Sequence, residues 1–190
     1  MKQKIAGIVV AGGLSTRMGR DKASLPWDGG TMLSAVLEKL NPVCSELIVV
    51  SNVHREINCL PVIIVPDKYP QRGPLAGIHA GLLAAHSEYA FVAACDMPYL
   101  STQAAGFIME AALAYDAAVP FIDGYYHPLH GVYRKSCIPF IEQRLRDGIY
   151  RVTDFYNDIN VRKITREEIA VFDPALRTLC NINSPEDLDT

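Results

Sequence analysis

A glycine-rich, positively charged loop follows the first apolar run of the chain. Residues 11–22 read AGGLSTRMGRDK, with Arg17, Arg20 and Lys22 within six residues and Asp21 as the one opposing charge. Glycine lets a backbone turn tightly and approach a ligand closely, and successive backbone N–H groups form a nest for anions. These residue types therefore predict a binding site for a polyphosphate, such as the triphosphate of a nucleotide.

Two common phosphate-binding motifs do not describe this loop. A Walker A loop requires G-x-x-x-x-G-K-[ST], but Gly19 is followed by Arg20 and Asp21. The dinucleotide fingerprint requires G-x-G-x-x-G, but Gly12 and Gly13 are adjacent. The structural alternative is a Gly-rich connection between a strand and a helix, with charges that are simply solvated.

Polar residues follow three later apolar runs. Asp96, Asp67 and Asn52 each come after such a run, and Ser51 competes with Asn52 at its position. A carboxylate suits a hard cation such as Mg²⁺, and it can also accept hydrogen bonds from N–H and O–H groups of a ligand. Each of these residues could instead be an ordinary turn or helix-capping residue.

Short β-branched runs alternate with longer Ala/Leu-rich runs over the first two-thirds of the chain. Apolar strands separated by helices predict a parallel sheet covered on both faces. Ligands of such sheets bind beyond the carboxyl ends of the strands, where the loop and the polar residues fall. The predicted strands are Ile5–Val10, Leu47–Val50, Val62–Val65, Tyr89–Ala94 and Ala117–Pro120, and the predicted helices are Thr31–Leu40, Leu75–Ala85 and Ser101–Tyr115.

The pattern changes after Asp123. We expect a strand at an edge of the sheet over Tyr125–Tyr133, a helix over Ser136–Arg146, short strands at Val161–Ile164 and Leu179–Cys180, and a helix start in NSPEDL. No repeat or linker interrupts the chain. We therefore expect a single domain over residues 1–190, with 1–120 as the nucleotide-binding half and 121–190 as the acceptor-substrate half.

Bulk composition excludes several function classes. The 190 residues carry a net charge of −3 without a run of five like charges, which argues against a nucleic-acid partner, because that needs a basic face. No apolar stretch approaches the roughly 20 residues that span a bilayer, so no membrane partner is expected. The five cysteines form no C-x-x-C pair, which indicates reduced thiols in the cytoplasm rather than zinc or disulfides.

The loop resembles the signature of the molybdenum cofactor guanylyltransferase (MobA) family and of MobA-like NTP transferases, approximately A-G-G-x-S-x-R-M-G-x-D-K. Further segments resemble later family blocks in the same order: GPLAG at 73–77, AACDMPYL around Asp96, HPLHGVY from His127 and NINSPEDL near the end. The resemblance implies an α/β, three-layer Rossmann-like nucleotidyltransferase fold, with a mostly parallel central sheet and helices on both faces. The positions that match the loop signature are Gly12, Gly13, Ser15, Arg17, Met18, Gly19, Asp21 and Lys22.

The resemblance also implies a reaction, in which GMP passes from GTP to molybdopterin that already carries molybdenum, and pyrophosphate leaves. Mg²⁺ is the implied cofactor, with Asp96 as its protein ligand, and Arg17, Lys22 and Asp96 are the implied catalytic residues. The nucleotide-binding candidates are Val10, Ala11, Gly12, Gly13, Lys22, Asn52, Asp67 and Asp96, and the acceptor-binding candidates are His127, Asn181 and Asn183.

His127 and His130 have the H-x-x-H spacing of a metal site. No third ligand is evident, and Pro128 disfavours the helix that such a site would use, so we expect one histidine to pack in the interior and the other to face the substrate. Besides GTP and molybdopterin, the implied partners are molybdoenzymes or molybdenum-insertion proteins. The chain is expected to be a monomer or a weak oligomer.

Three alternatives remain at this point. A cytidylyltransferase for the same cofactor resembles the chain over the same loop, but such relatives tend to read A-A-G where this chain has Ala11-Gly12-Gly13. A transferase for sugar or polyol phosphates is disfavoured by the HPLHGVY and NINSPEDL blocks. A catalytically silent nucleotide-binding scaffold for cofactor delivery is disfavoured by the presence of Arg17, Lys22 and Asp96.

Overall fold

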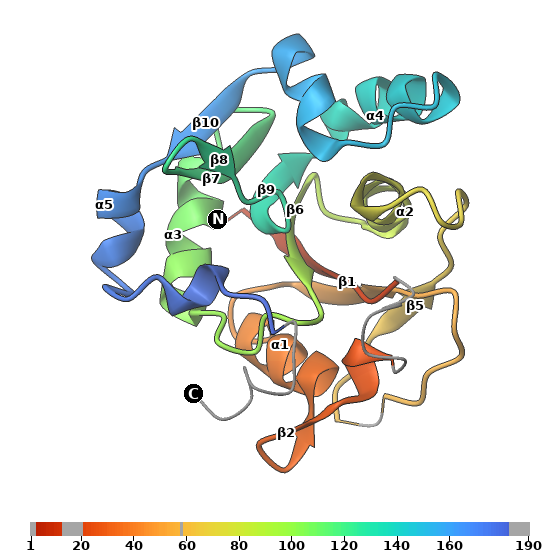
Figure 1. Ribbon diagram of the computed structural model, residues 1–190, viewed down its shortest axis with the longest axis vertical. Helices are drawn as coiled ribbons and strands as arrows, with labels where there is room; N and C mark the ends of the chain where they lie inside the picture. The colour runs from red at the N-terminus through yellow and green to blue at the C-terminus, as the bar shows by residue number, and fades with distance from the viewer. Residues whose placement is uncertain (1–2, 13–20, 58, 183–190) are drawn as a thin grey trace.

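A seven-strand path of one mixed sheet forms the centre of the molecule, and an eighth strand, β8, pairs with β7. The computed structural model describes residues 3–12, 21–57 and 59–182. Along the path the order is β10-β7-β9-β6-β1-β4-β5, with β6 in the middle and β1 beside it (Figure 1). The strands are β1 (Ile5–Val10), β4 (Glu46–Val50), β5 (Ile63–Val65), β6 (Tyr89–Ala94), β7 (Ala117–Ile122), β8 (Tyr125–Tyr126), β9 (His130–Arg134) and β10 (Val161–Ile164).

Helices cover both faces of this sheet. Figure 1 shows α2 and α4 on one side and α1 and α3 on the other, with α5 beside α3. In the part of the chain that the structure describes, the α-helices are α1 (Met32–Leu40), α2 (Pro74–Ala84), α3 (Thr102–Ala111), α4 (Ile138–Arg146) and α5 (Arg166–Ala170). The predicted α/β class with a mostly parallel sheet between two helical layers is confirmed.

Side chains along each strand point alternately to the two faces of the sheet, and this divides the apolar interior into two cores. Val9, Val49 and Phe91 belong to the cluster that contains the apolar faces of α1 and α3. Their sequence neighbours Ile8 and Val92 belong to the cluster that contains α2 and α4. Because successive side chains of a strand point to opposite faces, β1, β4 and β6 must be apolar throughout to serve both cores.

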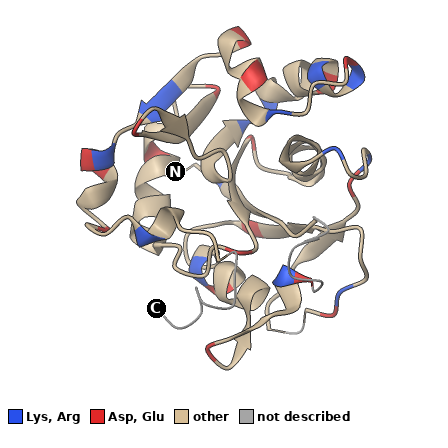
Figure 2. Cartoon of the chain, viewed as in Figure 1, with Lys and Arg blue, Asp and Glu red and all other residues tan. Residues whose placement is uncertain are grey.

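Charged residues stay outside these two cores. The central strands β1 and β6 and helix α2 contain none, and the Lys, Arg, Asp and Glu residues that the structure describes lie around them (Figure 2). Helix α2 packs closely on β1 because it carries glycine at the contact. A Cβ on Gly81 would lie 2.5 Å from Cγ2 of Ile8, and one on Gly77 would lie 2.7 Å from Cγ1 of Val10.

Most predicted elements agree with the structure. β1 and β6 have the predicted bounds, and the helix predicted from Thr31 forms with that residue as its N-cap. Thr31 accepts a hydrogen bond from the Ser34 N–H, and Ser34 bonds back to the N-cap backbone, as in a capping box. Ser101 likewise caps α3.

The edge strand predicted over Tyr125–Tyr133 is wrong. That segment forms two strands, and β9 lies inside the sheet, antiparallel to both β6 and β7. The break falls around Pro128, which lacks the N–H that a continuous ladder needs. Residues His130–Tyr133 are all buried, as an interior strand requires.

Two further predictions need correction. The strand expected at Leu179–Cys180 is instead a 3-10 turn over Arg177–Leu179, preceded by Leu176 at φ 54°. A hairpin of β2 (Pro26–Trp27) and β3 (Gly30–Thr31) was not predicted. Its turn, Asp28-Gly29, has positive φ at both residues and is a typical hairpin signal in sequence. The helix start predicted in NSPEDL lies outside the described residues.

Candidate active site

The carboxyl ends of three adjacent parallel strands define the site. Strand β1 lies between β4 and β6 in register, so Val10 is level with Val50 on one side and with Ala94 on the other. Backbone hydrogen bonds continue past these ends, from the Ala11 N–H to the Val50 carbonyl and from the Cys95 N–H to the Val10 carbonyl. The residues just beyond each strand are therefore held close together.

Asp96 lies at the centre of a polar cluster at this edge. Lys22 Nζ donates to Asp96 Oδ2 at 2.7 Å, and Asn181 Nδ2 donates to Asp96 Oδ1 at 2.8 Å. The Asp96 backbone carbonyl also accepts the N–H of Ile182 at 2.8 Å. The side chains of Lys22 and Asp96 are only 18% and 12% exposed. Opposite charges this close and this poorly hydrated interact more strongly than a surface ion pair.

The donor set at Asp96 fits a magnesium ion that takes most of its ligands from elsewhere. Each carboxylate oxygen has two lone-pair positions, so Lys22 and Asn181 leave acceptor capacity on both. Among residues 3–12, 21–57 and 59–182, no group of three or more His, Cys, Asp or Glu residues could hold a metal ion. Mg²⁺ commonly uses one or two carboxylates and completes its shell with water and substrate phosphates.

Asp21 is not available as a metal ligand, because its carboxylate oxygens already accept hydrogen bonds from the protein. It receives two hydrogen bonds from Arg55, at 2.6 and 3.0 Å, and one from the Ser24 hydroxyl at 2.9 Å. Burial opposes ionisation, but the hydrogen bonds and charge of Arg55, with help from Ser24 and the Ala23 N–H, hold the Asp21 pKa below its usual value. Arg55 is the residue of this site that the sequence did not reveal.

Asn52 and Asp67 meet at the neighbouring strand ends, beyond β4 and β5. The Asp67 N–H donates to Asn52 Oδ1 at 2.8 Å, and Asp67 Oδ1 accepts the Tyr69 N–H at 2.6 Å. Ser51, the competing candidate, is buried and bonds to Val53 and Arg55. The structure thus brings Asn52 and Asp67 together, and their contact with a nucleotide stays a prediction.

The first residues of the signature loop are structural where they are described. Val10 and Ala11 are buried, and their backbone groups bond to the sheet and to Arg55. Gly12 is exposed, and apart from its chain neighbours no atom of the described residues lies within 4 Å of where a Cβ would be. Gly13, Arg17 and Asn183, three of the predicted site residues, lie outside the described residues.

The two histidines of the H-x-x-H segment have different environments. His130 is fully buried, packs edge-on against Phe91 at 5.1 Å, and has Nε2 3.2 Å from the Thr178 hydroxyl. Burial lowers its pKa to about 3. His127 is partly exposed, and burial lowers its pKa although Asp123 acts in the opposite direction. His130 is therefore the packed histidine, and substrate contact by His127 stays a prediction.

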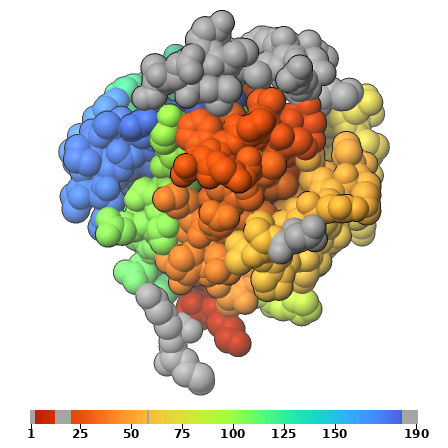
Figure 3. Space-filling model, turned by 90° about the horizontal axis from the view of Figure 1, so that it is seen from below, coloured from red at the N-terminus to blue at the C-terminus, as the bar shows by residue number. Residues whose placement is uncertain are grey.

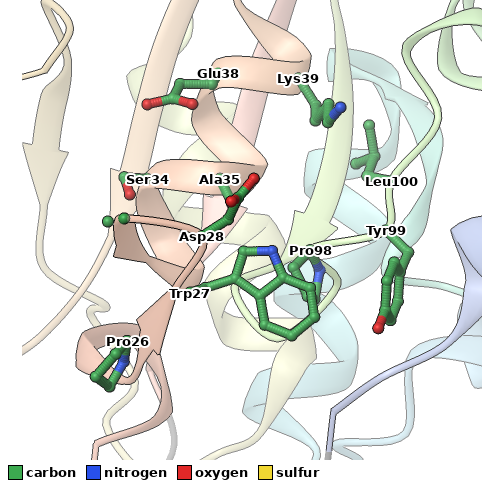
Figure 4. A pocket seen from close by; sticks show the side chains of 12 residues that line it. Pro26, Trp27, Asp28, Ser34, Ala35, Glu38, Lys39, Pro98, Tyr99 and Leu100 are labelled. Carbon is green, nitrogen blue, oxygen red and sulfur yellow. The ribbon is translucent and has the colours of Figure 1, made fainter. Parts of the chain in front are cut away.

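A pocket of about 790 Å³ lies beside the cluster rather than in it. The β2–β3 hairpin, helix α1 and the segment Pro98–Leu100 form its walls (Figure 4). Trp27 meets Tyr99 edge to face at 5.1 Å, and the Arg177 guanidinium lies 3.9 Å from the centre of the Tyr99 ring. Neither Lys22 nor Asp96 lines the pocket, whereas Tyr99, three residues after Asp96, forms part of its wall.

Known proteins share both the sequence and the fold. Residues 7–160 match the model of the MobA-like NTP transferase domain. A "Probable molybdenum cofactor guanylyltransferase" from Pelotomaculum thermopropionicum is 37% identical over 96% of this chain and 89% of its own length. A "Molybdenum cofactor guanylyltransferase" from Desulfosudis oleivorans is 35% identical over 97% of this chain and 93% of its own length.

A solved structure agrees with these relatives. The molybdopterin-guanine dinucleotide biosynthesis protein A from Archaeoglobus fulgidus superposes with a TM-score of 0.84 and 28% identity, over 97% of this chain and 95% of that one. The nucleotidyltransferase fold implied by the loop signature is thus confirmed along nearly the whole chain. With the family model matching across the loop, Asp96 and β9, this chain belongs to the MobA-like NTP transferase family.

Proposed function

We propose that this chain transfers GMP from GTP to molybdopterin, releasing pyrophosphate and forming molybdopterin guanine dinucleotide. The observation that carries the proposal is the shielded pair that Lys22, the last residue of the signature loop, forms with Asp96 at the carboxyl edge of the sheet. The names of the relatives in Pelotomaculum and Desulfosudis support guanine as the base and the molybdenum cofactor as the acceptor.

The reaction requires the protein to position the two substrates and to stabilise the charge that develops on the phosphates. The terminal phosphate of the acceptor attacks the α-phosphate of GTP, the bond to the β-phosphate breaks, and pyrophosphate leaves. Because the attacking phosphate is already ionised, no protein base is needed. Lys22 and Arg17 would neutralise charge that develops on the triphosphate and the leaving group, for which preorganised positive groups are effective. Bound Mg²⁺ would supply further charge neutralisation at phosphate oxygens.

Each described residue of the site has a part in this scheme. Asp96 would hold Mg²⁺, and Asn181 fixes the rotation of its carboxylate while Lys22 reaches it from the loop side. Backbone groups from Val10 to Gly13, with Asn52 and Asp67, would contact the nucleotide. His127, Asn181 and Asn183 would face the acceptor.

We place the protein in the cytoplasm as a monomer or weak oligomer that passes its product to molybdoenzymes or to proteins that insert the cofactor. All five cysteines are free, and burial raises the pKa of Cys44, Cys95 and Cys137 to about 12. Free thiols are typical of a reducing compartment. Among the described residues, no helix is both long and apolar enough to cross a bilayer.

A comparison of nucleoside triphosphates tests the proposal. With Mg²⁺ present, GTP at 100 times its dissociation constant should stabilise the fold by about 2.7 kcal/mol, which raises the melting temperature, whereas CTP, ATP and UTP should have little effect. Pyrophosphate release should require GTP together with molybdopterin. A preference for CTP would identify a cytidylyltransferase instead, and GTP binding without pyrophosphate release would identify a scaffold.

A further inference from the structure

We propose that Arg55 is a positioning residue of the transferase, which clamps together the two ends of the signature loop and the end of β4. It lies in the coil after β4, between Asn52 and Val62, where the family resemblance assigned no role. The inference builds on the proposed function as an NTP transferase, but not on which base the enzyme selects.

The guanidinium of Arg55 has five N–H groups, and each has an acceptor. Nε donates to the Ser51 hydroxyl at 2.8 Å, and Nη2 donates to the Ala11 carbonyl at 2.9 Å. The bidentate pair with Asp21 uses one N–H from each terminal nitrogen, at 2.6 and 3.0 Å. The remaining N–H of Nη1 points to the Ser24 hydroxyl at a longer 3.5 Å.

These acceptors come from three separate segments. Ala11 follows β1, Ser51 follows β4, and Asp21 and Ser24 belong to the 3-10 turn over Lys22–Ser24 that Asp21 caps. Ala11 is the first residue of the signature loop and Asp21 is its last but one, so a single side chain bonds to both of its ends. In the space-filling view the red-orange segment that follows the loop lies beside the yellow-orange segment that carries Arg55 (Figure 3).

Burial separates this arrangement from a surface ion pair. The Arg55 side chain is 6% exposed, and that of Asp21 is 38% exposed. A guanidinium removed from water is tolerated only when its charge is paired and its donors are satisfied, and both conditions hold here. A phosphate ligand would need free donors, and Arg55 has used its own on the protein.

The clamp acts on catalysis through Lys22. Asp21 precedes Lys22 directly, and Lys22 reaches Asp96 at 2.7 Å. Fixing Asp21 therefore fixes the starting point of the lysine that neutralises the triphosphate. Displacing a catalytic group by about 1 Å can lower a rate by about 100-fold. A lysine at position 55 would keep the charge, but it lacks the planar fork that bonds to both oxygens of Asp21.

The test uses Arg55→Lys and Arg55→Ala, with Arg134→Lys as the matched control, because Arg134 pairs with Glu88 on the surface with both side chains 45% exposed. With the triphosphate that the wild type prefers, Arg55→Lys should lower kcat/KM about 10- to 100-fold, mostly through kcat. Arg134→Lys should stay within twofold of wild type. Millimolar guanidinium should restore part of the activity of Arg55→Ala, whereas equal concentrations of sodium should not.

Two results would overturn the proposal. One is a kcat of Arg55→Lys within twofold of wild type. The other is full recovery of activity when the variants are assayed well below their melting temperatures, because that would show that Arg55 only stabilises the fold. A wild type that prefers CTP would contradict the proposed function yet leave this test intact, since the same variants are then assayed with CTP.

Discussion

At the residue scale, the site is made by contacts between distant parts of the chain. Lys22 and Asp96 are 74 positions apart, and Asp96 and Asn181 are 85 positions apart. Lys22 and Asp96 could be predicted because each follows a strand of a parallel sheet, whose carboxyl ends share one edge. The Asn181 contact with Asp96 and the whole role of Arg55 could not, because no local pattern encodes which coil residues meet after folding.

The charge of Asp96 can be tested with little change in shape. Asp96→Asn keeps the size of the side chain but removes the charge that pairs with Lys22 and would hold Mg²⁺. We expect kcat for pyrophosphate release to fall on the order of 100- to 1,000-fold, with the far-UV circular dichroism unchanged. Asp28→Asn is the control, because Asp28 is exposed at φ 42° and asparagine tolerates that conformation. If Asp96→Asn turned over at the wild-type rate at ordinary Mg²⁺ concentrations, Asp96 would have no part in the mechanism.

At the element scale, the strands and helices of the first two-thirds could be predicted because burial on both faces leaves a continuous apolar signal. The position of β9 in the sheet could not be predicted in this way. Its residues HGVYR show that a strand is present, but strand order depends on which edge is available once β6 and β7 have formed. Gly131 fits there because a Cβ would lie 2.8 Å from the Ala118 carbonyl oxygen.

Helix α2 and strand β1 offer a matched pair of glycine substitutions. Gly81→Ala would place a methyl group 2.5 Å from Cγ2 of the fully buried Ile8, so we expect it to reduce the free energy of unfolding by about 1–3 kcal/mol. In α3, the new methyl group of Gly106→Ala would meet no described atom within 4 Å apart from its own helix backbone and chain neighbours, so this change should instead stabilise the fold by about 0.5–1 kcal/mol. Urea denaturation of both variants measures the difference. Equal effects would mean that the α2–β1 contact is not close.

At the scale of the whole molecule, we propose that residues 1–190 are one cooperative unit with a nucleotide half and an acceptor half. Strand β9 belongs to the second half in sequence but pairs with β6 of the first, so neither half contains all the strands of the sheet. Unfolding followed by fluorescence of Trp27, the single tryptophan, should therefore coincide with unfolding followed by circular dichroism. Two separate transitions would contradict this organisation.

Global stability should also depend on His130. Its pKa is about 3 in the fold and 6.5 in the ordinary, unfolded environment, so below pH 6.5 the unfolded chain takes up a proton that the folded chain does not. The contribution of neutral, buried His130 to the free energy of unfolding is therefore fully present above pH 6.5. It is lost as the pH falls, and at pH 5 the free energy of unfolding is lower by about 2 kcal/mol. His130→Gln keeps a polar group near Thr178 but does not titrate. The stability difference between wild type and His130→Gln should shift by that amount from pH 7 to pH 5, and a constant difference would contradict it.

The late place of β9 in the chain bears on how the protein is made. A ribosome completes β6 well before residues 130–134 emerge, so a growing chain carries β6 with one row of N–H and C=O groups unpaired. Open strand edges of this kind join with other chains. We therefore expect chains that stop before His130 to aggregate more readily than the complete fold, in which β9 covers this edge of β6.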